Sequence, residues 1–231
     1  MDQGNSDFFT FQDIVDTRAR KGLELPLLKK YDPLVFWKPL GKDYFAGFRN
    51  AQQYQSAVRW INDRLKVMNV ENLLDAGCGF GRVIPFLLEA ESVKSAVGVD
   101  ISDSMLECAK EYLTPKEGSK LSQFRDKIEL KQADVRQLPF ESETFDCVLS
   151  CELLMHLDKE DMEKALREMI RVSRKYIMLV ERWAFPGEHN EPHIWSHNFS
   201  ELFASLGLGV LQSTAFPGNM QGVIAVKKIL G

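Results

Sequence analysis

The sequence predicts an α/β fold with a doubly wound, mostly parallel sheet. Three observations lead to this prediction. Short apolar runs typical of buried strands alternate with longer stretches of helical periodicity. Three successive strand-like runs each lead to an acidic residue, and a glycine-rich turn follows the first of them. A Pro-Gly turn near the C-terminus predicts a hairpin that closes the sheet.

The predicted strands are apolar runs that lie between turn formers. In chain order they cover residues 72–76, 95–100, 127–132, 145–150, 175–181, 209–215 and 222–228. Phe216-Pro217-Gly218-Asn219 joins the last two and predicts a tight connection between them. Helical segments separate the first five strands, which favours parallel pairing for them.

The predicted helices place apolar residues three and four positions apart, so that each buries one face. They cover residues 50–67, 81–90, 103–113, 159–172 and 199–206. Ser102 and Asp158 stand where they can cap the third and fourth of these helices. Pro85 fits the second helix because it falls near the first turn. Gly207 ends the last helix.

Residues 1–49 are rich in aromatic side chains and are broken by Pro26, Pro33 and Pro39. So much apolar surface favours burial over a free linker. We expect an N-terminal helical cap over the ligand end of the sheet, followed by the main domain at 50–231. A brace that packs elsewhere is the alternative, and periodicity does not separate the two.

Length and charge narrow the class of protein. At 231 residues with 45% apolar residues, the chain suits one domain with a sizeable core. With 29 basic and 33 acidic residues, the net charge of −4 disfavours a general nucleic-acid binder. No apolar run approaches the ~20 residues of a membrane helix, and the polar start does not resemble a signal sequence. We therefore expect a cytoplasmic protein without membrane contact.

The glycine-rich turn has the pattern Asp75-x-Gly77-x-Gly79-x-Gly81. Glycine lets backbone N–H groups approach a ligand closely. A dinucleotide-binding turn is the obvious alternative, but Arg82 stands where its third glycine would be. The acid at Asp75 also disfavours a pyrophosphate and favours a cationic amino group. A phosphate-binding loop is excluded because the lysine and hydroxyl residue after the glycines are missing.

Two further acids follow the next two strands. Asp100 comes 25 positions after Asp75, where a carboxylate is suited to hold a ribose diol. Asp134 follows the third strand and can accept a hydrogen bond from an exocyclic amine. Because parallel strands share one carboxyl edge, all three acids should meet where open α/β folds bind ligands.

This series, continued by Phe145-Asp146-Cys147-Val148, resembles the class I S-adenosylmethionine-dependent methyltransferases over roughly residues 50–231. The resemblance implies a Rossmann-like, seven-stranded sheet with strand order 3-2-1-4-5-7-6, and S-adenosylmethionine as cofactor. It assigns the methionyl end to Asp75, Gly77 and Gly79, the ribose to Asp100 and the adenine to Asp134. Further cofactor contacts are implied for Cys78, Arg82, Ile101, Met105, Val135 and Cys151.

The segment after the fourth strand faces the methyl group in this family, and here it carries Glu152 and His156. If the segment is helical, both side chains project from one face. They could then act as a general base, or as a base with its orienting carboxylate. A structural hydrogen bond is the alternative.

Ubiquinone-type and small-RNA O-methyltransferases carry Glu-x-x-Glu-His at this point and bind a divalent metal. Here Met155 replaces the second carboxylate, so we predict no metal site. His189, His193 and His197 could add nitrogen ligands, but prolines break any helix through them. Residues 184–198, with Trp195, could instead recognise the acceptor or form a solvated loop.

The sequence thus predicts an enzyme that transfers a methyl group from S-adenosylmethionine to oxygen or nitrogen of a small-molecule acceptor. One alternative is an RNA methyltransferase, such as a 2′-O-methyltransferase, which the net charge disfavours. Another is a non-catalytic methyltransferase-like subunit that only binds the cofactor. The sequence does not indicate the oligomeric state.

Overall fold

A computed structural model describes residues 32–48, 55–115, 120–182, 194–216 and 219–227. Its core is a seven-stranded sheet with order β3-β2-β1-β4-β5-β7-β6, as expected from the resemblance. The strands are β1 (Asn72–Ala76), β2 (Ser95–Asp100), β3 (Ile128–Gln132), β4 (Phe145–Cys151), β5 (Ser173–Arg182), β6 (Leu208–Phe216) and β7 (Met220–Lys227). Each begins and ends within two residues of its prediction.

Strands β1 to β5 are parallel, and β7 pairs antiparallel with both β5 and β6. The predicted closing hairpin is therefore confirmed. The strand order reverses at β1, which has β2 on one side and β4 on the other. Open α/β sheets bind ligands at the carboxyl ends of strands beside such a reversal.

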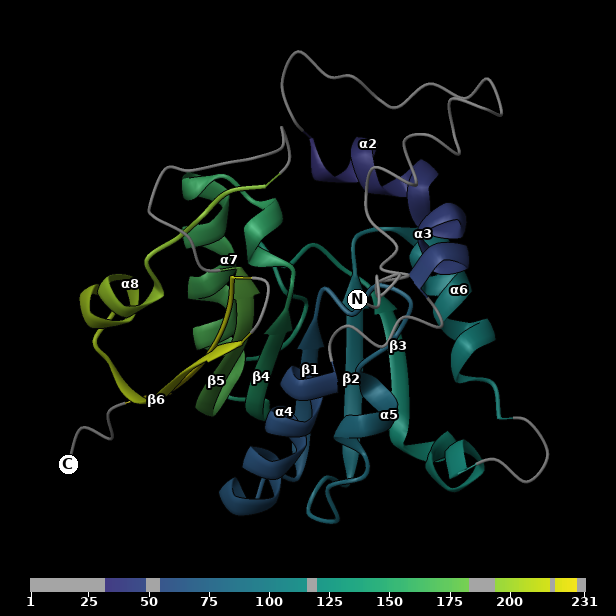
Figure 1. The fold of residues 1–231 in the computed structure, drawn as a ribbon, viewed down its shortest axis with the longest axis horizontal. Helices are drawn as coiled ribbons and strands as arrows, with labels where there is room; N and C mark the ends of the chain where they lie inside the picture. The colour runs from purple at the N-terminus through teal and green to yellow at the C-terminus, as the bar shows by residue number, and fades with distance from the viewer. Residues whose placement is uncertain (1–31, 49–54, 116–119, 183–193, 217–218, 228–231) are drawn as a thin grey trace, which may run out of the picture.

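Helices cover both faces of the sheet (Figure 1). They are α4 (Gln55–Met68), α5 (Ile84–Leu87), α6 (Asp103–Leu113), α7 (Lys159–Val172) and α8 (Phe199–Ser205). Successive side chains along each strand lie on opposite faces of the sheet and pack into two apolar layers. Leu73 packs with α4, α5 and α6, whereas its neighbour Leu74 packs with α7 and α8. This alternation makes the sheet doubly wound.

Two predicted helix caps are confirmed. The Ser102 side chain accepts a hydrogen bond from the N–H of Met105, and Asp158 accepts one from the N–H of Asp161. The predicted helix over 81–90 is wrong in length, because only α5 is helical there and Pro85 lies at its start. A 3-10 helix, η2 (Lys120–Lys127), precedes β3 and was not expected.

The described part of the N-terminal segment contains α2 (Pro33–Trp37), η1 (Lys38–Leu40) and α3 (Gly41–Phe48). These short helices lie beyond the carboxyl ends of the central strands in Figure 1. Their aromatic residues form a third apolar cluster with Phe80, next to the glycine turn, and Cys108 of α6. Residues 1–31 and 49–54 lie outside the described part, so the boundary expected at residue 49 stays a prediction.

Contacts with α6 hold this segment close to Asp100. The Ser104 hydroxyl donates to the carbonyl oxygen of Lys38 at 2.5 Å. A methyl group added at Gly41 would collide with the backbone nitrogen of Met105, at 2.9 Å. The helices α3 and α6 thus approach each other too closely for any side chain at residue 41. We call residues 33–48 the cap segment.

Candidate active site

A cavity opens at the carboxyl edge of the sheet, between the central strands and the cap segment. Its wall includes every residue predicted from the sequence to bind the cofactor. These residues are Asp75, Gly77, Cys78, Gly79, Arg82, Asp100, Ile101, Met105, Asp134, Val135 and Cys151. Glu152 and His156 line the same cavity. The structure therefore brings the whole predicted set together, although their individual roles remain predictions.

The glycine turn needs glycine for conformation and for space. Gly77, Gly79 and Gly81 all have positive φ values, between 53° and 77°. The N–H groups of Gly77 and Cys78 both donate to the carbonyl oxygen of Val99 at 2.8 Å, which ties the turn to β2. A methyl group built on Gly79 would meet no described atom within 4 Å. Open space at this backbone suits a bound ligand.

Asp100, at the end of β2, organises the turn. Its Oδ2 accepts a hydrogen bond from the N–H of Gly79, and its Oδ1 accepts one from the N–H of Ser102, both at 2.9 Å. Burial raises the pKa of the Asp100 carboxyl, and these N–H groups oppose that rise. A carboxylate has about four acceptor positions, and the N–H of Ile101 also contributes, so Asp100 can still accept from a diol hydroxyl.

Asp75 is buried, with only 2% of its surface exposed. Its Oδ2 accepts no hydrogen bond from any residue that the structure describes. Burial raises the pKa of the Asp75 carboxyl to about 7, the charge of Asp100 adds to the rise, and Arg82 opposes it. An unsatisfied buried carboxylate is costly. A cationic amino group is the kind of ligand that would stabilise its ionised form. The residues present thus fit the cofactor implied by the resemblance.

We expect cofactor binding to depend on pH through Asp75. Because a bound ammonium group favours the carboxylate, binding releases a proton wherever the free protein holds one. Affinity for S-adenosylhomocysteine should therefore rise from about pH 5 to about pH 7, by at most about tenfold per pH unit, and then level off. Calorimetric titration across this range measures the slope. The Asp75→Asn variant should bind more weakly above pH 7 and lose the slope; an unchanged slope would contradict this role.

Asp134 is less available than the sequence suggested. Arg136 donates from Nε to both of its carboxylate oxygens, at 2.9 and 3.0 Å, and from a terminal nitrogen to Oδ2 at 2.6 Å. Arg136 also pairs with Asp161 of α7. For Asp134 to accept the predicted hydrogen bond from an adenine amine, Arg136 must therefore give up at least one of its hydrogen bonds to this carboxylate.

The expectation that Glu152 and His156 share a helical face is wrong. Glu152 has a φ of 59°, outside any helix, and only Leu154–His156 form a short 3-10 helix, η3. The Glu152 carboxylate instead accepts a hydrogen bond from Arg82 at 3.0 Å. Both side chains of this ion pair are largely buried, with 8% and 15% exposed. Glu152 therefore fixes Arg82 at the cavity wall rather than orienting His156.

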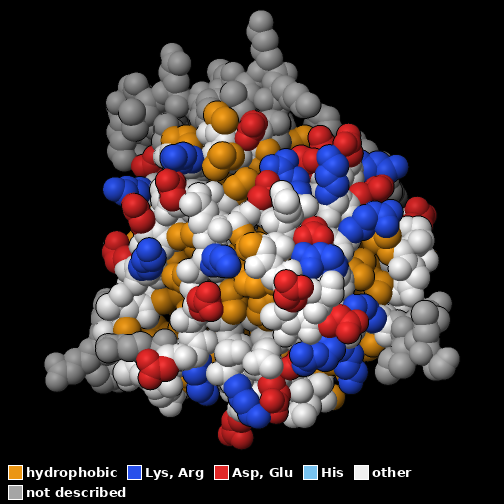
Figure 2. All heavy atoms as spheres, turned by 180° about the vertical axis from the view of Figure 1, so that it is seen from behind, with side chains coloured by type: hydrophobic (Ala, Val, Ile, Leu, Met, Phe, Trp, Pro, Cys, Tyr) orange, Lys and Arg blue, Asp and Glu red, His pale blue; other side chains and the backbone are white. Residues whose placement is uncertain are grey.

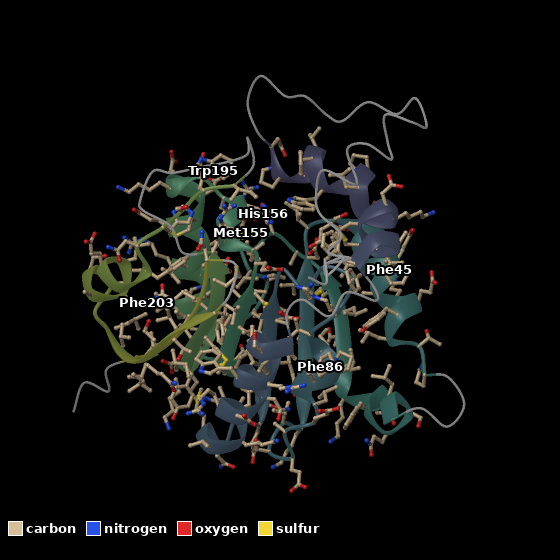
Figure 3. The ribbon with its side chains drawn as sticks, in the orientation of Figure 1. Phe45, Phe86, Met155, His156, Trp195 and Phe203 are labelled. Carbon is tan, nitrogen blue, oxygen red and sulfur yellow. The ribbon has the colours of Figure 1, made fainter. Side chains whose placement is uncertain are left out.

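His156 faces the cap segment. Its ring packs edge-to-face against Trp37, with 4.8 Å between ring centroids and an interplanar angle of 69°. Figure 3 shows His156 and Met155 near Trp195 and below the cap segment. Trp37 and Tyr44 line the cavity together with His156. The imidazole is thus placed where a bound acceptor could lose a proton to it.

Glu181, at the end of β5, is a site residue that sequence reasoning missed. It is fully buried, and its carboxylate accepts hydrogen bonds from the Ser150 hydroxyl at 2.5 Å and from the N–H groups of Leu153 and Met155 at 3.2 and 3.3 Å. It thereby anchors the segment that carries His156. An acid after an apolar run was the available signal, as it was for Asp100.

Glu181 should make stability depend on pH. Burial raises its pKa from an ordinary value near 4.5 to about 7, against the hydrogen bonds from Ser150, Leu154, Leu153 and Met155. The folded chain therefore holds more protons than the unfolded chain between these values, and its stability falls as pH rises through this window. The free energy of unfolding of the wild type, relative to Glu181→Gln, should drop by at most about 3 kcal/mol from pH 4.5 to pH 7.

Urea unfolding of both proteins at several pH values measures this difference, because other groups cancel in the comparison. Glu181→Ala should lose about 2–4 kcal/mol, since buried donors then have no acceptor. A relative stability that stays flat with pH would show that Glu181 does not titrate in this window.

The residues before α8 also contact the segment around η3 that Glu181 holds. His197 is buried, and its Nε2 lies 3.2 and 3.0 Å from the carbonyl oxygens of Leu154 and Leu157, to which it donates. The N–H of Trp195 donates to the carbonyl oxygen of Met155 at 2.8 Å. His197 therefore anchors η3. His193 lies outside the described residues.

The residues considered as metal ligands have other partners in the described parts of the chain. Within residues 32–48, 55–115, 120–182, 194–216 and 219–227, no three His, Cys, Asp or Glu side chains converge on a common point. The Glu152 carboxylate accepts a hydrogen bond from Arg82. The imidazole of His197 donates to the carbonyl oxygens of Leu154 and Leu157. His189 lies outside these ranges.

Within the described residues, no helix has the length and apolar character needed to cross a membrane.

Comparison with known proteins finds similarity to methyltransferases. Residues 74–177, which run from β1 into β5, match the family model described as a methyltransferase domain. The chain is 29% identical over 126 residues to norajmaline N-methyltransferase of Rauvolfia serpentina, covering 51% of this chain and 40% of that protein. It is 28% identical over 142 residues to erythromycin 3''-O-methyltransferase of Saccharopolyspora erythraea, covering 61% and 42%.

A solved structure of magnesium protoporphyrin IX methyltransferase from Synechocystis, with bound S-adenosylhomocysteine, superposes with a TM-score of 0.62 at 17% identity. The match covers 83% of this chain and all of that one, and it shows the shared fold. Residues 74–177 therefore match a methyltransferase domain, and the chain has the Rossmann-like fold of the S-adenosylmethionine-dependent methyltransferases, as the sequence predicted. It spans about two fifths of the length of the curated relatives named above.

Proposed function

We propose that this chain transfers a methyl group from S-adenosylmethionine to an oxygen or nitrogen of a small-molecule acceptor. The observation that carries the proposal is the meeting of two sets of residues in one cavity. Asp75, Gly79 and Asp100 offer a buried acid, an open backbone and a diol acceptor, and His156 lies in the same wall under the cap segment. The relatives named above include an N- and an O-methyltransferase, which supports either acceptor atom.

The cofactor, when bound, supplies a methyl group activated by its sulfonium. Asp100 would hold the ribose, and Asp75 the amino group at the other end, which fixes the methyl donor in line with the acceptor. A bound cofactor would offer its methyl carbon to the acceptor atom, with the bonding electron pair of the carbon–sulfur bond left on sulfur. The proton that the acceptor loses passes to the imidazole of His156. Alignment alone can contribute about 7–11 kcal/mol to such a reaction.

An RNA acceptor has a weaker case. A small RNA 2′-O-methyltransferase of Bombyx mori is 22% identical over 182 residues of this chain. However, Met155 replaces a carboxylate of that metal-binding pattern, and the face in Figure 2 intermingles acidic and basic side chains without a basic stripe. RNA binding would need such a positive surface.

Incubating the full chain with S-adenosylmethionine and pools of small phenols, amines and alcohols tests the proposal. We expect S-adenosylhomocysteine to form together with a methylated product, both detected by mass spectrometry. Cofactor binding without product from any pool, or from an added RNA pool, would favour the non-catalytic subunit. Product from the RNA pool alone would overturn the assignment of a small-molecule acceptor.

A further inference from the structure

We infer that the acceptor is a neutral, planar aromatic compound, which binds with its ring against Trp37 and its nucleophilic atom beside His156. The inference rests on the proposed function and assigns the chemical class of acceptor at the same site. It is carried by the cavity residues that come from α2 and from the segment after β4. These residues are Pro33, Trp37, Leu153, His156 and Leu157.

This part of the wall adjoins the place of the methyl donor. Leu153 lies directly over the glycine turn, because a methyl group added at Gly77 would come within 2.6–2.9 Å of Leu153 side-chain carbons. His156 follows three residues later at the end of η3. A compound held by Trp37 and Leu153 would thus have the turn that binds the methionyl end on one side and the candidate base on the other.

The aromatic surface is rigid. Trp37 packs edge-to-face with Phe36 at 5.2 Å, with Tyr44 at 5.6 Å and with His156 at 4.8 Å between ring centroids. Tyr44 in turn stacks on Phe48 at 4.4 Å. Aromatic rings prefer such edge or offset-stacked partners. A tryptophan held by these rings, with Pro33 and Leu157 in the same cavity wall, therefore favours a flat apolar ring over a flexible polar chain.

The charges around this wall favour a neutral acceptor. Arg82 and Glu152 pair with each other at 3.0 Å and are largely buried. Arg136 faces Asp134 and Asp161. Burial raises the pKa of Tyr44, so its hydroxyl stays uncharged. These charges already face opposite charges, and Asp75 and Asp100 are assigned to the cofactor, so a charged acceptor would enter without a counter-ion, which is costly.

Three compounds of similar size test whether the acceptor must be aromatic and whether it must be neutral. The full chain is saturated with S-adenosylhomocysteine and titrated calorimetrically with 2-naphthol, trans-decahydro-2-naphthol and 6-hydroxy-2-naphthoate. We expect 2-naphthol to bind at least about tenfold more tightly than its saturated analogue, from the loss of ring contacts. The naphthoate should bind more weakly than 2-naphthol because its charge has no partner.

Two variants locate the effect. Trp37→Leu should bring the preference for 2-naphthol over the saturated analogue close to one while S-adenosylhomocysteine still binds. Val35→Ala, on the exposed side of the same helix, should leave the preference unchanged. Equal binding of the two naphthols, tighter binding of the naphthoate, or no binding of 2-naphthol to the saturated protein would overturn the inference. Failure to bind S-adenosylhomocysteine itself would instead overturn the proposed function.

Discussion

Replacing Asp100 with alanine is expected to weaken binding of S-adenosylmethionine by about 100-fold or more. The carboxylate would lose its charge-assisted hydrogen bonds to the ribose, each worth about 1.5–3 kcal/mol. The variant also removes the acceptor for the N–H groups of Gly79 and Ser102, so the glycine turn loses one of its links to β2. Isothermal titration calorimetry measures the dissociation constant directly.

Two companion variants separate these effects. Asp100→Asn keeps an oxygen that can accept from one N–H group, so it should bind more tightly than Asp100→Ala and less tightly than the wild type. Glu107→Ala removes an exposed acid from the outer side of α6 and should change affinity by less than about twofold. Unaltered affinity in Asp100→Ala would show that the ribose is held elsewhere.

Removing the imidazole of His156 is expected to lower kcat by about 10²–10⁴-fold, the usual contribution of a general base. The affinity for S-adenosylhomocysteine should stay within about threefold, since His156 stands on the acceptor side of the cavity. Single-turnover rates with an acceptor found in the product screen measure the chemical step.

A structural role for His156 predicts a different pattern. Its ring packs on Trp37, so a gap left by alanine could disturb the cap segment. The His156→Phe variant retains a ring at this contact but accepts no proton. We expect it to be as slow as His156→Ala; a rate near that of the wild type would exclude proton transfer to this residue.

The sequence predicted best what depends on local chemistry. Strands β1 and β2 have the predicted bounds, because each is a short apolar run with a turn at its end. The caps Ser102 and Asp158 are local in the same sense. The residues predicted to bind the cofactor lie in one cavity because parallel strands bring their carboxyl ends to one edge, which turns spacing along the chain into proximity.

The errors arose where a long-range partner decides the conformation. Glu152 would share a face with His156 only on a helix, but it adopts a left-handed backbone in which its carboxylate meets Arg82, 70 residues away. His197 lies in a segment for which acceptor recognition and a solvated loop were both open, but it is buried against the carbonyl oxygens of Leu154 and Leu157. Nothing in the local sequence specifies such pairings.

Gly41 shows that the position of the cap segment also depends on a long-range contact. An aromatic-rich start indicated burial but not where the burial occurs. The location depends on close approach of Gly41 to α6, with Phe45 and Phe48 packing around Phe80 of the glycine turn. These contacts join parts of the chain that share no local pattern, so only the structure places Trp37 and Tyr44 over the cavity.

Titration of the wild-type chain with S-adenosylhomocysteine, and separately with nicotinamide adenine dinucleotide, tests the central claim most directly. The arrangement of Asp75, Gly79 and Asp100 predicts saturable binding of the first compound at one site, and no measurable binding of the second, whose pyrophosphate would face a carboxylate. Absence of binding to S-adenosylhomocysteine, or preference for the dinucleotide, would contradict it.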